Sequence, residues 1–309
     1  MAFLFKILSL LPLWVAHGVG WVLGWLAWSL SSSYRARLRE NADQAGVSQG
    51  ARWRSIGAAG QQVAELPRLW FGKPVPITLH NTELVDEALA RGPGIVFLTP
   101  HLGCFEIMAQ AYANRYGIDG SGTGQSPARP GRPITVLFRP PRKAWLTELV
   151  SQARVRPGLA TAPTSLAGVK QMIKALKKGE SVGLLPDQVP PMGQGVWSPF
   201  FGRNAYTMTL AVRLALQTDA TILIAWGKRL SWGRGYAVHV LPLATRVQSR
   251  SGSGQAEEPP NVSKGASGLA PDLEGAVRQV NAAMETLIRT CPEQYLWGYA
   301  RYKQPKVEP

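Results

Sequence analysis

The sequence predicts an α/β protein with a mainly parallel central sheet flanked by helices, preceded by an apolar N-terminal helix that anchors the chain to a membrane. Segments typical of strand and of helix alternate through the middle of the 309 residues, which favours a parallel sheet covered by helices. Residues 94–99 form a short apolar run bounded by Gly-Pro and by Pro100, the pattern of a buried parallel strand. Residues 8–30 are nearly all apolar, and this run is long enough to span a bilayer.

The N-terminal segment, residues 1–33, is interpreted as an uncleaved membrane anchor because it offers no good signal-peptide cleavage site. Its apolar run contains four tryptophans, Trp14, Trp21, Trp25 and Trp28. Several basic residues follow the run and do not precede it, namely Arg35, Arg37 and Arg39. Residues 34–309 are interpreted as one domain, which should lie on the cytoplasmic side by the positive-inside rule. Because the run contains Pro12 and His17, a helix that lies shallowly in the membrane interface is an alternative interpretation. A buried core helix is a second alternative.

The elements of the domain follow from apolar periodicity and from Pro or Gly boundaries. Helical spacing of apolar residues and closure by prolines predict a helix at 53–70, with a shorter one at 82–90. The strand at 94–99 is followed by a predicted helix at 104–116 and a strand at 133–138. The remaining predictions are helices at 166–178, 209–217 and 272–290, the last capped by Asp272, and strands at 181–185, 221–227 and 235–241.

Two segments, residues 119–132 and 249–270, are predicted to be flexible loops. Both are rich in Gly, Ser and Pro and lack apolar periodicity, so they bury too little surface to offset the entropy of ordering.

Composition limits the kinds of partner. Lys and Arg outnumber Asp and Glu by 34 to 19, a net charge of +15, which favours anionic lipid headgroups, acidic proteins or nucleic acid without choosing among them. The two cysteines, Cys104 and Cys291, have no metal-binding or disulfide-framework spacing, and no phosphate loop or dinucleotide motif occurs. We therefore expect a reducing compartment, no cofactor and no metal.

Polar residues follow three of the predicted strands directly. His101, Arg139 and Asp187 each stand just after a strand, and in parallel sheets ligands bind outside the carboxyl ends of strands. The sequence therefore predicts that these three residues converge at one edge of the sheet.

The pair His101 and Glu106 has the residue types that acyl transfer to a hydroxyl needs. A neutral imidazole can take the hydroxyl proton, and a carboxylate on the other ring nitrogen fixes the tautomer and stabilises the imidazolium. Gly103 lets substrate or backbone approach closely, and N–H groups free at the helix start would bind a phosphate or an oxyanion. The alternative is a helix-capping histidine beside a solvated carboxylate, and spacing alone does not decide between the two.

The run His101 to Glu106 resembles the H-x4-D/E motif of the glycerolipid acyltransferase superfamily. The wider sequence resembles the late acyltransferases of lipid A biosynthesis, the lauroyl/myristoyl acyltransferase family. The resemblance rests on blocks in the family's order: residues 33–41 (SYRARLREN), 99–106 (TPHLGCFE), 137–140 (LFRP), 185–188 (LPDQ), 199–202 (PFFG) and 292–297 (PEQYLW). The two predicted loops look like insertions, and Pro186 stands where the family usually has alanine before Asp-Gln.

The resemblance implies a fold like that of glycerol-3-phosphate acyltransferase and a location at the bacterial inner membrane, with the catalytic domain on the cytoplasmic face. The implied reaction is transfer of a fatty acyl chain from acyl carrier protein to a hydroxyl-bearing acyl chain of a lipid A precursor, without a covalent acyl-enzyme. His101 would be the general base and Glu106 its partner. Arg139 is carried over as substrate-binding, with a strand-end salt bridge as its alternative role.

Further site residues are expected beside these. Asp187 and Gln188 match the family's Asp-Gln pair and would orient Arg139 or bind the acceptor sugar, and Arg203 is a candidate for binding anionic substrate. Cys104 lies in an apolar stretch, where a thiol pKa rises, so we expect a packed and inert cysteine. The protein is expected to be a monomer that binds no nucleic acid.

Two rival interpretations remain open from the sequence. The same base chemistry would acylate another membrane acceptor, such as a glycolipid, a lysophospholipid or an ornithine lipid. A non-catalytic basic protein that binds a membrane surface or nucleic acid, with His101 in a structural role, is the rival from another class.

Overall fold

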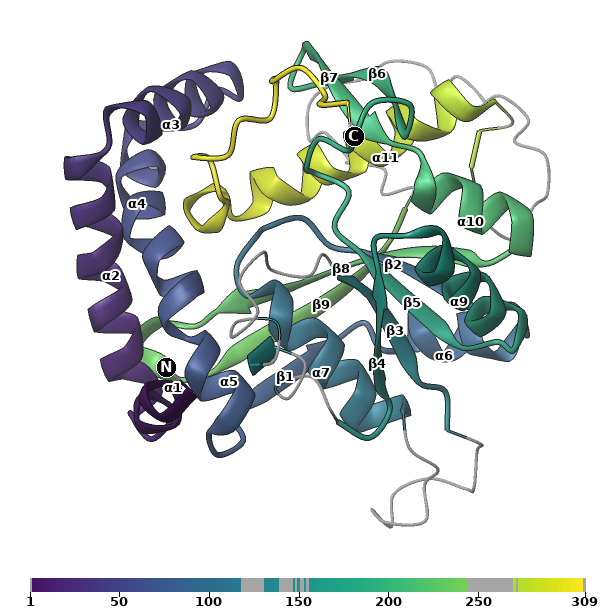
Figure 1. Cartoon of the computed structure of the whole chain (residues 1–309), viewed down its shortest axis with the longest axis horizontal. Helices are drawn as coiled ribbons and strands as arrows, with labels where there is room; N and C mark the ends of the chain where they lie inside the picture. Colours follow the sequence, from purple (N-terminus) through teal and green to yellow (C-terminus); the bar gives the residue numbers. More distant parts are fainter. Residues whose placement is uncertain are drawn as a thin grey trace, which may run out of the picture.

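The computed structural model contains a seven-stranded sheet and a separate two-stranded sheet (Figure 1). It describes residues 2–117, 131–138, 147, 149–150, 153, 156–243, 269–270 and 272–307. The large sheet has the strand order β1-β9-β8-β2-β5-β3-β4. All its neighbouring pairs are parallel except β8 with β9, which form an antiparallel hairpin. The predicted mainly parallel α/β sheet is therefore confirmed.

The strands of the large sheet are short. They are β1 (Ile77–His80), β2 (Ile95–Leu98), β3 (Ile134–Phe138), β4 (Leu159–Pro163), β5 (Ser181–Leu184), β8 (Thr221–Arg229) and β9 (Tyr236–Pro242). The small sheet pairs β6 (Gly195–Phe200) with β7 (Arg203–Met208) in antiparallel register. The 3-10 turn η2 (Ser231–Gly233) forms the tip of the β8–β9 hairpin, and η3 (Pro292–Gln294) follows the last helix.

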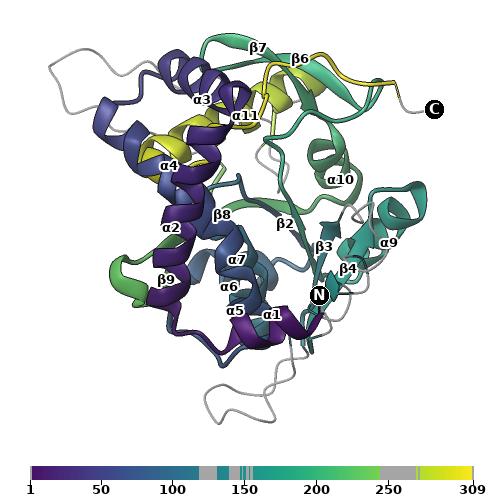
Figure 2. The same cartoon turned by 60° about the vertical axis from the view of Figure 1, so that its left-hand side comes forward.

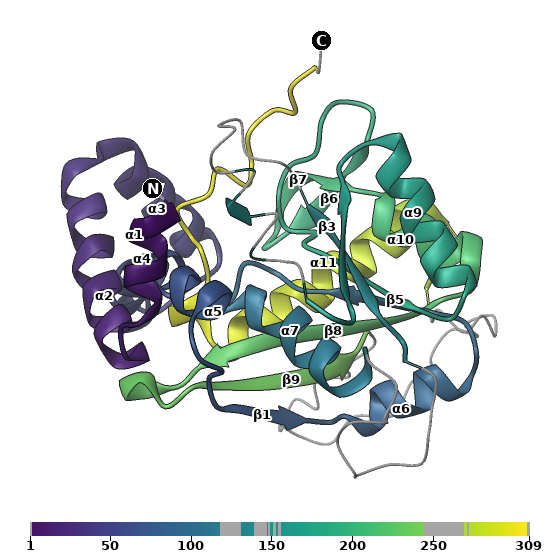
Figure 3. The ribbon, with the colours of Figure 1, turned by 60° about the horizontal axis from the view of Figure 1, so that its bottom comes forward.

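Side-chain alternation along β2 divides the core between the two faces of the sheet. Ile95 and Phe97 pack in the core that includes α6 (Glu83–Ala90) and α7 (Phe105–Tyr116). Val96 and Leu98 pack on the other face, in the core that includes α9 (Leu166–Lys177), α10 (Leu210–Thr218) and α11 (Leu273–Thr290). Figure 3 shows the strands running between these two groups of helices. Both faces of β2 are buried, which is why its sequence is continuously apolar.

The N-terminal helices form a column beside the sheet (Figure 2). They are α1 (Ala2–Ser9), α2 (Leu13–Leu30), α3 (Ser32–Gln44), α4 (Gln49–Ala64) and α5 (Leu66–Phe71). Pro12 stands between α1 and α2 and interrupts the predicted apolar run at 8–30, because proline lacks the N–H that a continuous helix needs.

Glycines let α2 and α4 approach closely. A Cβ atom on Gly24 would lie 2.2 Å from the carbonyl oxygen of Ile56, and one on Gly60 would lie 2.0 Å from that of Gly20. The stripe of α2 buried in this contact consists of Leu13, Ala16, His17, Gly20 and Gly24. We call this contact the glycine seam.

Most of the remaining surface of α2 is exposed and apolar. Its exposed large side chains are Trp14, Val19, Trp21, Val22, Leu23, Leu26 and Leu30. Among the described residues, α2 is the one helix long and apolar enough to cross a membrane, judged by length and composition alone. Because α4 lies against it from Gly20 to Gly24, α2 is not a free-standing span in this structure.

Most predicted elements are present with boundaries shifted by a few residues. The helix predicted at 53–70 is instead two helices, α4 and α5, and Asp272 caps α11 as expected by accepting a hydrogen bond from the Gly275 N–H at 2.7 Å. Residues 118–130 and 244–268 lie outside the described residues, so the two flexible loops stay predictions.

Candidate active site

His101 and Asp187 meet because their strands are neighbours in the sheet. His101 follows β2 and Asp187 follows β5, and these strands pair in parallel. One Asp187 oxygen, Oδ2, accepts the backbone N–H of His101 at 2.8 Å, and the other, Oδ1, lies 2.8 Å from the ring nitrogen Nδ1. The carboxylate therefore holds both the backbone and the ring of His101, and the predicted convergence of these two residues is confirmed.

The second ring nitrogen of His101 faces Gln188. The amide nitrogen Nε2 of Gln188 lies 3.0 Å from His101 Nε2. A proton on Nδ1, donated to Asp187, leaves Nε2 unprotonated and able to accept from this amide. The side chain of His101 keeps 15% of its surface exposed. The arrangement is that of a general base with its basic nitrogen directed away from its carboxylate partner.

Asp187 is held in its charged form. Its side chain is buried, which by itself raises the pKa of a carboxyl, but His101 and the nearby cation of Arg301 outweigh burial and lower that pKa. Arg301 is also buried, and it is fixed by donating to the Tyr206 carbonyl at 2.8 Å and to the Thr207 hydroxyl at 2.7 Å. Asp187 is thus a buried anion stabilised by the hydrogen bonds of His101 and by the positive charge of Arg301.

Glu106 lies elsewhere than predicted. Its Oε1 atom accepts the indole N–H of Trp70 at 3.1 Å, and its charge acts on Arg156. The carboxylate on the His101 ring is that of Asp187, so the prediction that Glu106 orients this ring needs correction. The physical reason is local: His101 precedes α7 in an irregular turn, whereas Glu106 begins the helix and its side chain is buried against α5.

Gly103 was expected to allow the close approach of substrate or of backbone, and the structure shows close approach of backbone. Its φ of +59° and the 2.1 Å that a Cβ would leave to the Gly227 carbonyl oxygen require glycine. The close neighbour is therefore backbone of β8 and not substrate. The N–H groups of Gly103 and Cys104 donate to the carbonyls of Gln294 and Gly227 at 3.0 and 2.8 Å, so these two donors are not free for an anion.

Cys104 is buried, and burial raises its pKa well above the ordinary value. The predicted packing of this cysteine is confirmed, and its raised pKa disfavours the reactive thiolate. Within the described part of the chain, no group of three or more His, Cys, Asp or Glu side chains could hold a metal ion.

Several of the sequence blocks singled out above are joined to one another by hydrogen bonds near His101. The His101 carbonyl accepts the Leu296 N–H at 3.1 Å, which ties the TPHLGCFE block to the PEQYLW block. Asn41 from the SYRARLREN block donates to the Trp297 carbonyl at 2.6 Å. Blocks separated by up to 256 residues in the chain are thus joined by hydrogen bonds.

The model of one protein family, the bacterial lipid A biosynthesis acyltransferases, matches residues 1–304. The chain belongs to this family.

Curated relatives agree with the family assignment at modest identity. The chain is 25% identical over 215 residues to a lipid A biosynthesis acyltransferase of Haemophilus influenzae, covering 70% of this chain and 55% of that protein. It is 28% identical over 255 residues to the lipid A biosynthesis lauroyltransferase of Escherichia coli, covering 81% and 71%. The palmitoleoyltransferase of Escherichia coli is 24% identical over 177 residues, covering 57% and 50%. The match thus spans only about half the length of two of these three relatives.

Two other predicted substrate residues of this family member lie apart from the His101 cluster or outside the described residues. Arg139 follows β3 but is outside the described residues, so its role stays a prediction. Arg203 forms an ion pair with Glu40 of α3, and its guanidinium lies 4.6 Å from the centre of the Tyr302 ring. These contacts are with α3 and the C-terminal segment.

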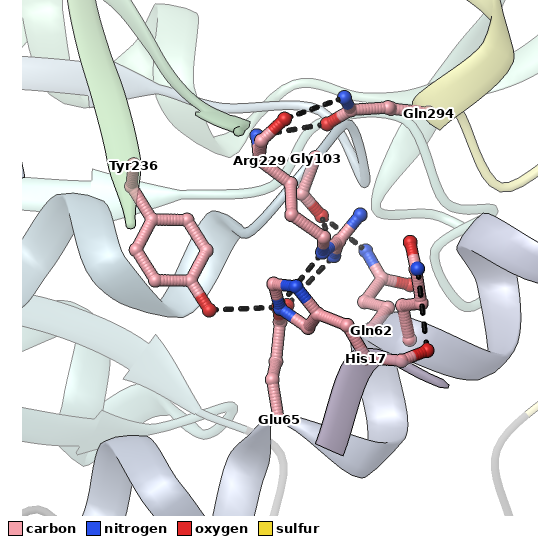
Figure 4. Close-up of polar contacts among 8 residues, drawn as sticks. His17, Gln62, Glu65, Gly103, Arg229, Tyr236 and Gln294 are labelled. Carbon is pink, nitrogen blue, oxygen red and sulfur yellow. Dashed lines mark hydrogen bonds and ion pairs between the residues drawn. The ribbon is translucent and has the colours of Figure 1, made fainter. Parts of the chain in front are cut away.

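Sequence reasoning missed a second polar cluster, built on Glu65 and Arg229 (Figure 4). Both side chains are buried, and they form a two-pronged ion pair with distances of 2.8 and 2.7 Å. A single Glu at a helix end and a single Arg at a strand end form no local pattern, so only the folded structure joins them. His17, for which sequence reasoning predicted no function, lies 3.1 Å from the same carboxylate and donates to it when Nε2 carries the proton.

Proposed function

We propose that the protein transfers a fatty acyl chain from acyl carrier protein to a hydroxyl on an acyl chain of a lipid A precursor, with His101 as general base. The observation that carries the proposal is the His101–Asp187–Gln188 cluster, in which a buried carboxylate holds one ring nitrogen and leaves the other for a substrate. Membership of the family supports the acceptor class. Acidic acyl carrier protein fits the net charge of +15.

The proposed reaction proceeds in one addition and one elimination. His101 Nε2 takes the hydroxyl proton as the acceptor oxygen attacks the thioester carbonyl, and Asp187 stabilises the imidazolium that forms. The C–O bond forms, the C–S bond then breaks, and the imidazolium returns the proton to the departing thiolate. No acyl-enzyme is needed, which agrees with the burial and raised pKa of Cys104, the one thiol in the motif.

The side-chain amide of Gln188 is proposed to occupy the position that the acceptor hydroxyl takes in the complex. Its amide lies 3.0 Å from the basic nitrogen, the distance at which a hydroxyl would donate. In the complex, the hydroxyl would replace the amide at Nε2, and Gln188 would then be available to bind the substrate. Arg139, the residue after β3 in the sequence, is proposed to bind a phosphate of the acceptor through its planar guanidinium group.

The roles of the two carboxylates are separable by experiment. Steady-state rates with acyl carrier protein thioester and a lipid A precursor should fall by roughly 100-fold or more in both His101→Ala and Asp187→Asn. Asp187→Asn should also move the acidic limb of the kcat/KM pH profile to lower pH, because the imidazolium loses its counter-charge. Glu106→Gln should leave the position of that limb unchanged, and Glu87→Gln, on the surface of α6, serves as the control. A shifted limb in Glu106→Gln with an unshifted one in Asp187→Asn would return the orienting role to Glu106.

The acceptor is tested in cells. Mass spectrometry of lipid A from a deletion strain should show loss of one secondary acyl chain, restored by the wild-type gene and not by His101→Ala. An unchanged lipid A profile would contradict the lipid A assignment and would favour another membrane acceptor.

We further infer that the exposed face of α2 rests in a membrane, at the cytoplasmic face of a bacterial inner membrane. The face is apolar along its whole length, and Arg35 caps its C-terminal end by donating to the Trp28 and Ser29 carbonyls at 2.9 and 2.6 Å. The β8–β9 hairpin tip adds Trp232, which is 87% exposed and adjoins α2, since a Cβ on the neighbouring Gly233 would lie 2.3 Å from the Trp14 nitrogen. Tryptophan and arginine at such a boundary suit the lipid headgroup region.

A further inference from the structure

The Glu65–Arg229 pair lies between α2, the helix proposed to face the membrane, and the turn of residues 101–104, which carries His101 and is called the catalytic turn below. Glu65 is 0% exposed and accepts hydrogen bonds from Arg229 Nε and Nη2, from the Tyr236 hydroxyl at 2.8 Å and from His17 Nε2 at 3.1 Å (Figure 4). These donors come from three separate elements: β8, β9 and α2. One carboxylate therefore joins α2 to the sheet at the end of β8.

Arg229 reaches from this carboxylate to the turn that carries His101. Its Nη2 atom donates to the Gly103 carbonyl at 3.1 Å, and Gln62 of α4 donates to the same oxygen at 3.2 Å. The Gly103 N–H donates to the Gln294 carbonyl at 3.0 Å. Gly103 is thus held on both sides of its residue, in a left-handed conformation with φ of +59°.

The side-chain amide of Gln294 fixes the backbone of Arg229. Its amide oxygen accepts the Arg229 backbone N–H at 2.9 Å, and its amide nitrogen donates to the Arg229 carbonyl at 3.0 Å. These bonds fix the start of the Arg229 side chain, while Glu65 fixes its end. The guanidinium therefore has one position from which to hold the Gly103 carbonyl.

His17 is the one polar side chain in the buried stripe of α2. Its neighbours in the stripe are Leu, Ala and Gly, which pack without direction, whereas the His17 ring bonds a single atom of the carboxylate. A shift of α2 along α4 would therefore first change the hydrogen bond between His17 and Glu65. The change would then pass to the Glu65–Arg229 pair and to the bond between Arg229 and the Gly103 carbonyl.

We propose that Glu65, Arg229 and His17 are positioning residues, which couple the placement of α2 to the conformation of the catalytic turn. Gly103 is two residues from His101, so a displaced Gly103 carbonyl moves the imidazole relative to Asp187. Displacements of about 1 Å at a catalytic group reduce rates by about 100-fold. The coupling lets the helix that meets the lipid set the geometry of the base, and its kinetic consequence rests on the function proposed above.

The test uses His17, because loss of this ring leaves the Glu65–Arg229 pair intact. In the full-length protein in lipid vesicles, His17→Ala should lower kcat by about tenfold, as expected for loss of a hydrogen bond to a charged group, with the acceptor KM unchanged. His17→Gln keeps an N–H donor and should recover most of kcat. Gln62→Ala, which removes a donor directly from the Gly103 carbonyl, should lower kcat in the same way. His80→Ala, at an exposed histidine of β1 outside the cluster, is the matched control.

A second readout does not depend on the reaction. Cys104 is buried next to Gly103, so its labelling by a maleimide, followed on its own peptide by mass spectrometry, measures opening of the catalytic turn. His17→Ala and Gln62→Ala should speed this labelling, and His80→Ala and His17→Gln should not.

The outcomes separate the coupling from the proposed function. Wild-type labelling in both His17→Ala and Gln62→Ala would overturn the coupling, as would a loss of kcat that merely follows reduced vesicle binding or reduced thermal stability. Failure of His17→Gln to restore kcat would also overturn it. A wild-type protein that transfers no acyl chain to a lipid A precursor would refute the proposed function, and the labelling comparison would still decide the coupling.

Discussion

Burying the Glu65 charge costs free energy, and the four hydrogen bonds that its carboxylate accepts offset this cost. Burial alone would raise its pKa, but the charge and hydrogen bonds of Arg229, with those of His17, hold it at about 2. The folded protein therefore keeps Glu65 ionised at pH values where an unfolded chain, with an ordinary value of 4.5, binds a proton.

At the residue scale, this shift predicts a pH-dependent stability. Glu65→Gln should lower the free energy of unfolding at pH 7 by about 3–5 kcal/mol, because Arg229 stays buried without its counter-charge. The stabilisation by Glu65 is fully present above pH 4.5 and is lost as pH falls toward 2, so the gap between variant and wild type should narrow over that range. Denaturant unfolding in detergent at a series of pH values measures the gap, with Glu87→Gln as control. A gap that stays constant would show that Glu65 keeps its ordinary pKa.

Residue-level prediction succeeded where a residue follows a strand and failed where its partner is distant. His101 and Asp187 were located from strand ends, but the bond between them joins residues 86 apart, and five-residue spacing favoured Glu106 instead. Glu65, Arg229 and Arg301 carried no local signal, because a buried ion leaves a pattern only in three dimensions.

At the element scale, the glycine seam predicts opposite effects for two glycines of the same helix. A Cβ on Gly24 meets the Ile56 carbonyl, whereas one on Gly18 meets nothing within 4 Å. Gly24→Ala should therefore destabilise the protein by about 1–3 kcal/mol through overpacking. Gly18→Ala should stabilise it by about 0.5–1 kcal/mol, because alanine loses less backbone entropy in a helix. Thermal unfolding in detergent compares the two, and equal shifts of the same sign would contradict close packing of α2 on α4.

Helices and strands whose apolar residues follow a clear pattern were predicted from the sequence, and those with a weak apolar pattern were not. The fully buried β2 and β5 and the amphipathic α9 and α11 were predicted, since burial on one or both faces is reflected in their sequences. The strand β6 contains Pro199, which argues against a strand by sequence. The helix α3 is polar around most of its circumference and gives no apolar stripe.

At the scale of the whole molecule, α2 and the tip of the β8–β9 hairpin form the face that we propose contacts lipid, on a protein with a net charge of +15. Figure 3 shows the hairpin turn reaching the helical column. Association with vesicles should therefore have an apolar part that resists salt and an electrostatic part that salt screens.

This face predicts the effect of removing a single tryptophan. Trp232→Ala should weaken binding to vesicles containing anionic lipid by about tenfold, because a large side chain no longer leaves water on binding. The loss should persist at high salt. Trp197→Ala, an exposed tryptophan of β6, is the control. Vesicle co-sedimentation measures both, and equal binding by the two variants would place the lipid contact elsewhere.

The contact between the catalytic turn and Gln294 also orders events during synthesis. Translation runs from the N-terminus, so α2, the helix proposed to contact lipid, emerges from the ribosome while Gln294 is still untranslated. Until then the Gly103 N–H lacks its partner and Arg229 lacks the amide that fixes its backbone. If the proposed contact of α2 with lipid forms at this stage, the nascent chain is tethered before its active site is complete. The turn that carries His101 closes only after nearly all of the described sequence has been made.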